Sequence, residues 1–322
     1  MNSRQTKQYT MDLAVVGEIN ADLILRGNVI PAFGQVEQIV KEADLVMGSS
    51  AVIFACGAVR LGLTTAFFGK VGDDMFGNFM VESMTKRGID TSGIIRDPKV
   101  KTGFSVILSK EQDRAILTYP GSIPELRYDE IDLQLVSRCR HLHLSSFFLL
   151  NNLRPYIPTL FRNAKAAGLT ISLDTNYDPD QKWDGYLNKA METVDVFLPN
   201  ETEAKAISRK RDAKSALLEL QKRIPTVAVK LGEDGAIAKQ AGNPIIQQPA
   251  LAVKVVDTVG AGDSFDAGFI YGYLNGWSLA ETLEFAVACG SISTTKAGGT
   301  EGQANLDIAM IFIHGFNNQA GG

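Results

Sequence analysis

The sequence predicts an α/β fold in which a mostly parallel central sheet carries helices on both faces and a small β-sheet forms a lid. Two observations lead to this prediction. Short apolar runs of strand length alternate with longer helical stretches through most of the 322 residues, which is typical of a parallel sheet flanked by helices. One pair of strand-like runs, within residues 103–119, breaks this alternation, so we place it outside the main sheet.

The predicted helices and strands differ in the residue types that they contain. The predicted helices carry apolar or small residues on at least one face, and several end at a glycine, which suits the backbone at a helix C-terminus. The predicted strands are rich in β-branched and other apolar residues. We expect helices at residues 51–61, 75–87, 154–167, 266–274 and 278–295, and a further helix that begins at residue 201. We expect strands at residues 13–17, 64–68, 141–145, 169–174, 194–198, 226–230 and 251–256. A loop is expected at residues 69–74 and a hairpin within residues 236–246.

The predicted lid comes from two separate parts of the chain. Residues 103–108 and 114–119 are apolar, and the stretch between them is polar, as in a β-hairpin. With a partly exposed strand region at 27–47, this hairpin would form a small sheet, which we bound at about 27–47 and 100–121. Hairpins that leave a domain often cover a binding site, and a surface hairpin without such a role is the alternative.

Composition and charge exclude several classes of function. The net charge of −4 gives no basic surface for nucleic acid, and the three cysteines have no metal-ligand spacing. No run approaches the about 20 apolar residues of a membrane helix. His141 and His143 share one strand face without a third ligand nearby, which favours a structural role. We expect a cytoplasmic protein with one domain at residues 11–322 after a polar, disordered tail at 1–10.

Polar or glycine-rich clusters recur after the predicted strands. In a parallel α/β sheet, ligands bind at the carboxyl ends of the strands, so six clusters in this position indicate a functional site. In the first cluster two polar side chains point the same way along an extended chain; they form either a pair that recognises hydroxyl groups or a surface turn. The clusters are Asn20/Asp22, Gly48/Ser49, Asp174/Asn176, Asn200/Glu203, Lys230/Gly232 and Asp257–Asp263.

The last cluster has the sequence DTVGAGDSF at residues 257–265 and lies between a predicted strand and a predicted helix. A turn of small residues at a helix N-terminus leaves backbone N–H groups unpaired, and the helix dipole adds positive charge there, so the pattern predicts an anion site. Asp263 stands at the mouth of this site. A carboxylate beside an anion site is typical of a general base, and an aspartate that only caps the helix is the alternative.

Two common phosphate-binding patterns are missing from the sequence. It contains no Gly-x4-Gly-Lys-Ser/Thr loop and no Gly-x-Gly-x-x-Gly after the first predicted strand. An anion site with a carboxylate that faces a hydroxyl-recognising pair instead suits phosphoryl transfer to an alcohol. In such a reaction the aspartate accepts the hydroxyl proton, and the helix N-terminus and a metal ion spread the charge of the transferred group.

Four stretches resemble the PfkB, or ribokinase-like, carbohydrate kinase family, and together they extend over about residues 12–300. Residues 257–270 look like the C-terminal signature of that family and residues 48–62 like its N-terminal signature. Residues 70–77 and 199–203 are similar to two further family elements. The resemblance implies a ribokinase-like fold, ATP and Mg²⁺ as cofactors, and a small sugar-like molecule as substrate.

The resemblance also implies a role for each matching residue. Asp263 would be the base on the substrate hydroxyl, and the backbone N–H groups of Gly260, Ala261 and Gly262 would form the anion hole. The implied sugar-binding residues are Asn20, Asp22, Gly48 and Ser49, with Arg114 or Tyr119 reaching in from the lid. The implied nucleotide-binding residues are Asn200, Glu203, Lys230, Gly232 and Gly235, with Glu203 holding Mg²⁺ through water.

Some members of the family bind a monovalent cation near residues matching Asp257 and Val259, and the sequence leaves open whether this chain binds K⁺ there. One departure from the family pattern concerns the substrate. The N-terminal signature usually has a second glycine and an asparagine that contacts the sugar, where this chain has Ser49 and Ile53. The serine is a mild change, but isoleucine forms no side-chain hydrogen bond. An unpaired buried hydroxyl costs about 1–3 kcal/mol, so we expect poor binding of ribose and a different sugar or sugar acid as substrate.

Two other functions stay open at this point. A nucleoside kinase of the same fold would need a flat aromatic slot, which Phe33, Phe104 or Tyr119 would supply. A catalytically silent sugar-binding regulator would have no physical need of Asp263. The resemblance further implies a homodimer through the lid, whose thin sheet has apolar faces to cover.

Overall fold

Residues 9–110 and 113–320 are described by the computed structural model, with side chains as far as residue 314. Within them, nine strands form the main sheet in the order β13-β12-β11-β10-β9-β8-β1-β4-β5. The seven strands from β11 to β5 are parallel, and β12 and β13 are antiparallel additions at one edge. The strands are β1 (Met11–Val16), β4 (Thr65–Gly72), β5 (Asp90–Asp97), β8 (Cys139–Leu144), β9 (Thr170–Leu173), β10 (Val196–Phe197), β11 (Thr226–Lys230), β12 (Ala236–Gln240) and β13 (Ile246–Gln248).

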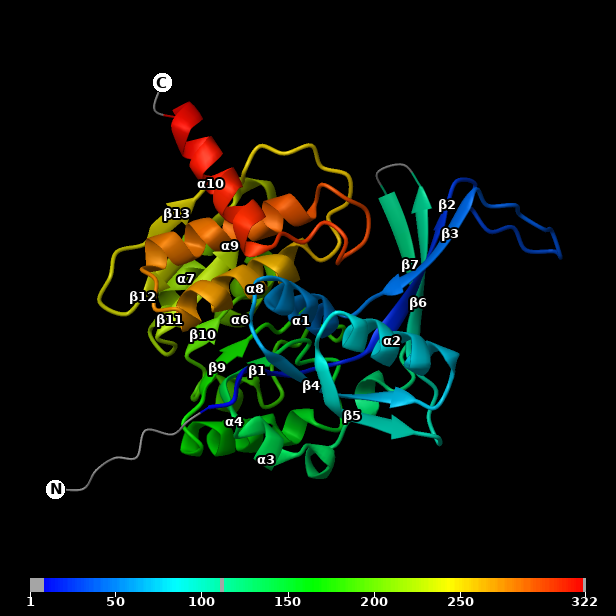
Figure 1. Ribbon diagram of the computed structural model, residues 1–322, viewed down its shortest axis with the longest axis horizontal. Helices are drawn as coiled ribbons and strands as arrows, with labels where there is room; N and C mark the ends of the chain where they lie inside the picture. Colours follow the sequence, from blue (N-terminus) through cyan, green and yellow to red (C-terminus); the bar gives the residue numbers. More distant parts are fainter. Residues whose placement is uncertain (1–8, 111–112, 321–322) are drawn as a thin grey trace.

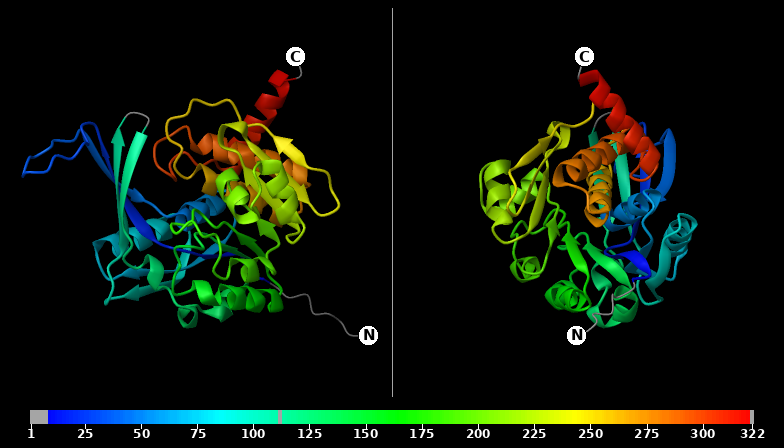
Figure 2. Two further views of the ribbon diagram at one scale, coloured as in Figure 1. Left: turned by 180° about the vertical axis from the view of Figure 1, so that it is seen from behind. Right: turned by 60° about the vertical axis from the view of Figure 1, so that its left-hand side comes forward.

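Helices cover both faces of this sheet (Figure 2). Alternate strand residues enter two separate apolar cores, with Leu13 and Val15 in one and Ala14 and Val16 in the other, as expected when both faces of a sheet are buried. The first core contains α1 (Ser50–Arg60), α2 (Met75–Lys86), α8 (Ala261–Leu274), α9 (Leu279–Ser293) and α10 (Leu306–Ala320). The second contains α3 (Leu133–Val136), α4 (Ile157–Ala166), α5 (Leu187–Met191), α6 (Glu201–Ser208) and α7 (Ala213–Gln221). The short 3₁₀ turns are η1 (Ile123–Glu125), η2 (Tyr128–Glu130), η3 (Arg154–Tyr156) and η4 (Gly232–Asp234).

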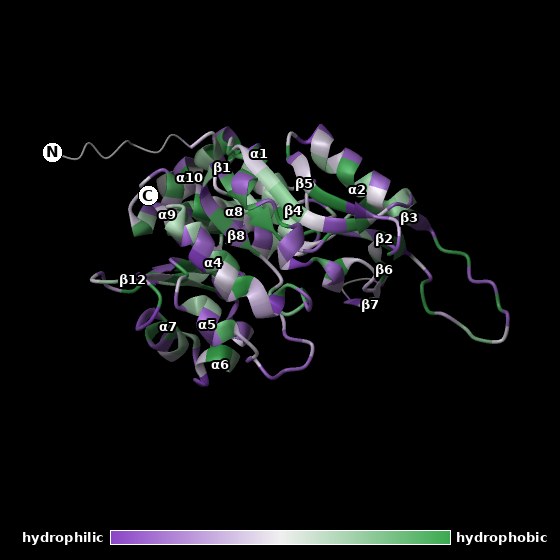
Figure 3. Ribbon diagram, turned by 90° about the horizontal axis from the view of Figure 1, so that it is seen from below, coloured by the Kyte–Doolittle hydropathy of each residue, from purple (hydrophilic) through white to green (hydrophobic). Residues whose placement is uncertain are grey.

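A second sheet of four strands stands beside the main body (Figure 1). Its order is β3-β2-β6-β7, from β2 (Asn20–Arg26), β3 (Glu42–Met47), β6 (Gly103–Lys110) and β7 (Asp113–Tyr119). β2 and β6 are parallel, and the two outer pairs are antiparallel. We keep the word lid for this sheet. The loop between β2 and β3 extends away from the lid (Figure 3). It carries exposed apolar side chains, with Phe33 99% exposed.

The α/β class, the mostly parallel main sheet and the smaller second sheet were all predicted from the sequence and are confirmed. Several boundaries were wrong. Residues 69–72 continue β4, because the next strand, β5, pairs with them, and β5 itself was not predicted. Within 27–47 only residues 42–47 form a strand, and the lid begins earlier, at Asn20.

The segment at 251–256 was predicted as a strand and is not one. Its backbone is tied to helix α9 instead, because Leu251 N donates to Ser291 Oγ and Val256 N donates to Thr294 O. Helix α8 begins at Ala261, five residues earlier than predicted. None of the described helices is long and apolar enough to span a membrane. Of the predicted tail at 1–10, residues 1–8 lie outside the described residues.

Candidate active site

The carboxyl ends of the parallel strands and the N-termini of two helices meet at one edge of the main sheet. Glu18 follows β1, Asp174 follows β9, and Lys230 ends β11. Helices α1 and α8 begin close together, since Ile53 of α1 packs against Gly260 at the start of α8, and the Ser50 hydroxyl lies near enough to Asp263 to lower its pKa. Three of the six predicted clusters lie at the carboxyl ends of main-sheet strands, namely Asp174/Asn176, Asn200/Glu203 and Lys230/Gly232. Gly48/Ser49 follows the lid strand β3, Asn20/Asp22 lies within the lid strand β2, and Asp257–Asp263 extends into the first turn of α8.

Helix α8 brings Asp263 to the site in its first turn. Gly260 stands at the N-cap with a φ of 71°, a left-handed conformation that glycine adopts without strain and that turns the chain into the helix. The amide of Ala261 donates to Thr258 O at 3.3 Å. The amide of Gly262 has no acceptor in the part of the chain that the structure describes. Free amides at a helix N-terminus attract anions, so the Gly262 amide is available at the turn where the sequence predicts an anion site.

Asp263 is buried, and its pKa is raised to about 8. Burial is the main cause, because it disfavours the charged form of a carboxyl group, and the neighbouring Asp174 adds repulsion. Lys230 and the Ser50 hydroxyl act in the opposite direction. A carboxyl group whose pKa lies near neutrality is suited to accept a proton in a reaction.

Lys230 occupies the centre of a buried group of carboxylates. Its Nζ lies 2.9 Å from Asp174 Oδ2 and 3.0 Å from Asp266 Oδ2. Oxygens of Asp174, Asp263 and Asp266 lie within 4.8 Å of one another, which is the spacing of a cation site, but here the Lys230 ammonium group supplies the positive charge. Burial acts to lower the pKa of Lys230, and Asp174 and Asp266 outweigh it and raise that pKa. The lysine therefore stays charged.

Asp174 and Asp266 both contact Lys230, and their pKa values are shifted in opposite directions. Burial favours the neutral form of each. For Asp174, attraction to Lys230 outweighs burial and keeps its pKa below the usual value. For Asp266, burial and the nearby Asp174 charge dominate, and its pKa lies well above the usual value. The two carboxyl groups therefore share the positive charge of one buried ammonium group.

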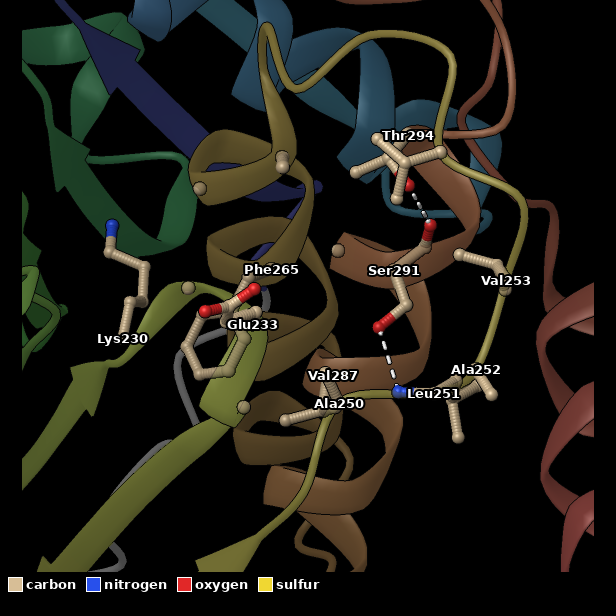
Figure 4. Close-up of a pocket in the computed structure, with 16 residues that line it drawn as sticks. Lys230, Glu233, Ala250, Leu251, Ala252, Val253, Phe265, Val287, Ser291 and Thr294 are labelled. Atoms are coloured by element: carbon tan, nitrogen blue, oxygen red, sulfur yellow. Dashed lines mark hydrogen bonds between the residues drawn. The ribbon is translucent and has the colours of Figure 1, made fainter.

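A cavity of about 370 Å³ opens beside the first turn of α8 (Figure 4). Lys230, Gly232 and Gly235 line one side of it, and Ala261 and Gly262 line another. The remaining lining comes from apolar side chains that include Leu251, Val253, Phe265 and Val287. The irregular backbone at 251–256, which is tied to α9 by hydrogen bonds, thus forms part of the wall of this cavity.

Asn200 and Glu203 form a reciprocal cap at the start of α6. Glu203 N donates to Asn200 Oδ1 at 3.0 Å, and Asn200 N donates to Glu203 Oε2 at 3.0 Å. Burial, and then repulsion from Asp174, raise the pKa of Glu203 to about 7. These two residues do not line the cavity. Asn200 instead pairs with Lys230 through an isolated β-bridge, and Glu203 interacts electrostatically with Asp174 and Lys230.

Asn20 and Asp22 form the predicted polar pair on one face of β2. Asn20 Nδ2 donates to Asp22 Oδ1 at 2.8 Å. Gly48 lies directly against both, since a Cβ atom there would be 2.3 Å from Asp22 Oδ1, so a larger residue would displace the pair. Burial raises the pKa of Asp22 to about 6, although Ser105, Asn20 and Arg114 oppose this.

The two predicted lid residues differ in position. Arg114 of β7 reaches toward the site, where its guanidinium lies 3.9 Å from Asp257 Oδ1 and interacts with Asp22. Tyr119 is 47% exposed and contacts the Phe104 ring, with 5.8 Å between ring centroids. Asp257 itself accepts hydrogen bonds from Val259 N and Gly298 N, so both oxygens of the predicted cation-binding carboxylate already have donors.

The two departures from the family signature have structural consequences that the sequence did not show. Ser49 has a φ of 73°, a conformation that favours glycine, so its replacement of glycine is not a mild change. Its hydroxyl compensates, because it donates to Glu18 O at 2.6 Å and accepts from Val52 N at the start of α1. The Ile53 side chain packs close to Gly260 and Gly299, so it contacts the glycine turn that begins α8.

Sequence reasoning missed three residues of the site. Glu18 is buried, its Oε1 accepts from Ser50 N at 2.9 Å, and within the described residues its Oε2 has no hydrogen-bond partner. Ser50 and Asp266 were within quoted motifs but received no role. The signal for Glu18 was a charged residue directly after an apolar strand, where burial is expected and an acid needs a reason to be present.

The comparisons with known proteins agree with this geometry. The sequence profile described as pfkB family carbohydrate kinase matches residues 10–305. The chain belongs to the pfkB family of carbohydrate kinases. The predicted family, ribokinase-like fold and enzyme class are confirmed.

Relatives with sugar-acid names extend over nearly the whole chain. A 5-dehydro-2-deoxygluconokinase of Geobacillus thermodenitrificans (strain NG80-2) is 29% identical over 323 residues, which is 95% of this chain and 94% of that protein. A 2-dehydro-3-deoxygluconokinase of Bacillus subtilis (strain 168) is 29% identical over 80% of this chain and 84% of that protein. An uncharacterized sugar kinase of Archaeoglobus fulgidus is 32% identical over 76% of this chain and 97% of that protein.

Solved structures share the fold at lower identity. A putative ribokinase II from E. coli in complex with ATP and Mg²⁺ has a TM-score of 0.84 and 24% identity, with 94% of this chain and 99% of that chain covered. An Arabidopsis thaliana ribokinase complexed with ribose and ATP has a TM-score of 0.82 and 24% identity, with 94% of this chain and 98% of that chain covered. The match therefore includes both the main sheet and the lid.

Proposed function

We propose that this carbohydrate kinase transfers the terminal phosphoryl group of ATP to a hydroxyl group of a sugar acid, with Asp263 as the general base. One observation supports the proposal most directly: the buried Asp263 follows Ala261 and Gly262, which line the nucleotide-sized cavity, in the first turn of α8. Its neighbour Ser50 lies two residues after Gly48, which lies against the polar pair on β2. Phosphoryl transfer suits this arrangement, because the acceptor oxygen attacks the phosphorus in line with the leaving oxygen of the donor, while the base takes the proton of the acceptor hydroxyl.

The cavity and its polar rim suit a nucleotide. Its apolar wall, with Val253, Phe265 and Val287, would take the base, and the glycine backbone at 232 and 235 would let the ribose and phosphates approach closely. The terminal phosphate would lie against the amides of residues 260–262, of which the Gly262 amide is free for it. This assignment makes Gly260, Ala261 and Gly262 the anion hole.

The donor set also fits Mg²⁺, which prefers carboxylate oxygens together with phosphate and water. Glu203, held by Asn200, would be the residue that binds the ion through water. When bound, the ion supplies positive charge to the phosphoryl group during transfer. A K⁺ site at Asp257 and Val259 stays a prediction.

The chain's own residues account for the proton and the substrate. Asp263 takes the proton from the acceptor hydroxyl, and Asn20 and Asp22 orient the other hydroxyls. Arg114, which already interacts with Asp22 and Asp257, is placed to pair with a substrate carboxylate, because guanidinium groups bind carboxylates in two-point contacts. The relatives named for keto-deoxy sugar acids support this substrate class.

A nucleoside as acceptor is less favoured. The Phe104 ring lies 5.0 Å from Phe76 and 5.8 Å from Tyr119, between centroids, so this ring already has aromatic neighbours. Phe33 is on the extended loop and fully exposed. These positions do not form a slot for a purine next to Asp263.

The test is an ATP-coupled assay with aldoses, ketoses, keto-deoxy sugar acids, inositols and nucleosides. We expect turnover with a keto-deoxy sugar acid and a loss of about 10²–10⁴-fold in kcat for Asp263→Asn, the usual range for a general base. The matched control is Asp307→Asn on α10, an exposed aspartate far from the site. Near-normal turnover of Asp263→Asn would show that the base is another residue. Sugar binding without any transfer would favour the silent regulator.

A further inference from the structure

The side-chain amide of Asn176 connects the start of helix α1 with the segment that follows strand β8. It lies beyond the carboxyl end of β9, and its Nδ2 donates to Ser50 Oγ and to Ser146 Oγ, each at 2.7 Å. Its backbone has a φ of 53°, and its backbone amide donates to Asp174 Oδ1 at 2.9 Å. Asparagine tolerates this left-handed conformation better than most residues, so the backbone holds the side-chain amide between the two serines.

The two hydrogens of the Asn176 side-chain amide determine which way the hydroxyl groups of Ser50 and Ser146 can donate. A side-chain amide nitrogen carries two hydrogens and accepts none, and here each hydrogen goes to one serine oxygen. Each hydroxyl group therefore keeps its own hydrogen for another acceptor. The Ser50 hydroxyl faces Asp263 and lowers the pKa of that carboxyl group, and the Ser146 hydroxyl lowers the pKa of Glu18 in the same way. One amide thus directs a hydroxyl donor toward each of two buried carboxyl groups.

We propose that Asn176 and Ser50 are positioning residues for Asp263, in which Asn176 orients the Ser50 hydroxyl so that it donates to the carboxylate that accepts the substrate proton. The inference rests on the proposed role of Asp263 and adds residues for which no role was predicted. Ser50 is well placed for this, because its backbone amide is held by Glu18 Oε1 at 2.9 Å and it begins α1. The Ser50 side chain therefore has little freedom apart from rotation of the hydroxyl itself.

The first test is the pH profile of kcat/KM for Ser50→Ala. A hydrogen bond donated to an ionised carboxylate favours the ionised form, so its removal raises the pKa of that group. We expect the acidic limb of the profile to move to higher pH and kcat/KM to fall by about 10- to 100-fold at neutral pH, as for a misplaced catalytic group. Alanine suits the first position of a helix, so this variant retains the fold, which its urea unfolding curve checks.

The second test is a double-mutant cycle with Asn176→Asp. An aspartate has nearly the same shape and tolerates the same backbone conformation, but it accepts hydrogen bonds from both serines and turns the Ser50 hydrogen away from Asp263. We expect Asn176→Asp to move the acidic limb further in the wild-type background than in the Ser50→Ala background, where only its added charge acts. Equal shifts in both backgrounds would mean that the amide does not act through Ser50.

Two control variants distinguish the positioning role of Asn176 and Ser50 from a general loss of structure. Ser146→Ala removes the other hydrogen bond of the same amide, toward Glu18, and is expected to leave the acidic limb of Asp263 without an upward shift. Asn163→Asp makes the same exchange at an exposed position of α4 and is expected to match the wild type. A wild-type profile for Ser50→Ala, with Asp263→Asn inactive, would overturn this inference and leave the base assignment standing; turnover by Asp263→Asn would overturn both.

Discussion

Lys230 and Arg114 are both cationic side chains near the site, but one is buried and the other comes from an exposed strand. Lys230 is buried between Asp174 and Asp266, whereas Arg114 extends from β7, a strand on which every residue is exposed. In the interior a charge without its partner is very costly, so the Lys230 contacts hold the fold and the site in one arrangement. On the lid the surrounding water screens charge, so Arg114 is free to respond to a ligand. The comparison predicts that changes at the centre affect stability and changes on the lid affect substrate affinity.

The largest effect is expected at the centre. Lys230→Met removes the ammonium group and leaves two buried aspartates without their cation, which typically costs about 3–5 kcal/mol of unfolding free energy. Urea unfolding at pH 7 measures this. The control is Lys205→Met, which removes an exposed pair with Glu201 on α6 and is expected to cost less than about 1 kcal/mol. An equal loss of unfolding free energy in both variants would mean that the buried ion pairs of Lys230 contribute no more to stability than an exposed ion pair.

The buried histidines give the main sheet a sensitivity to acid that the lid lacks. His143 bonds to Ser172 and Ser145, and burial lowers its pKa from 6.5 to about 3. A group whose pKa is lower in the folded state stabilises the fold above the unfolded pKa and loses that contribution as pH falls. Between pH 6.5 and 3, His143 should therefore cost up to about 1.4 kcal/mol per pH unit.

Urea unfolding of the wild type and His143→Asn at pH 7, 6 and 5 checks the sign and size of this dependence. The variant should lose less stability than the wild type between pH 7 and 5, whatever its stability at pH 7. His314, on α10 outside this hydrogen-bonded group, provides the control variant His314→Asn, which should keep the wild-type slope. A wild-type slope in His143→Asn would assign the acid sensitivity to other groups.

On the lid, the expected effect is on binding. Arg114→Met removes the cationic group that reaches Asp22 and Asp257, and a hydrogen bond to a charged group contributes about 1.5–3 kcal/mol. We expect KM for a sugar acid to rise about 10-fold or more, with stability close to that of the wild type. Steady-state kinetics with Lys99→Met, at an exposed turn, as control measure this. A fall in kcat at unchanged KM would place Arg114 in the chemical step.

The smallest effect is expected at Ser49, where two contributions oppose each other. Ser49→Gly relieves the left-handed backbone strain and removes the cap of α1, so the unfolding free energy should change by less than about 1 kcal/mol. Ser49→Ala keeps the strain and loses the cap, which should cost about 1–2 kcal/mol. Thermal and urea unfolding of the pair separates the two contributions. If alanine is tolerated as well as glycine, the hydroxyl contacts to Glu18 and Val52 contribute little.

Local sequence patterns were sufficient for much of this architecture. The caps at Asp74, Asn200 and Ser278 use side chains within three residues of the amides they satisfy, so each signal is visible in the sequence itself. The pair of Asn20 and Asp22 was also predictable, because an extended chain alone puts alternate residues on one face. The glycines at 260 and 262 indicated the anion site for the same local reason.

Only the tertiary structure decided how these pieces combine. Lys230 meets Asp174 and Asp266 across 56 and 36 residues of sequence, and Asn176 meets Ser50 across 126. The apolar segment at 251–256 had the composition of a strand, but its amides found partners on α9 and not on a sheet edge. Hydrogen bonds and ion pairs of this range depend on which surfaces packing brings together. The sequence by itself therefore determined the fold class, most of the elements and the kinase signatures, because these depend on local patterns. Packing determined the charge and hydrogen-bond network around Asp263, the proposed base.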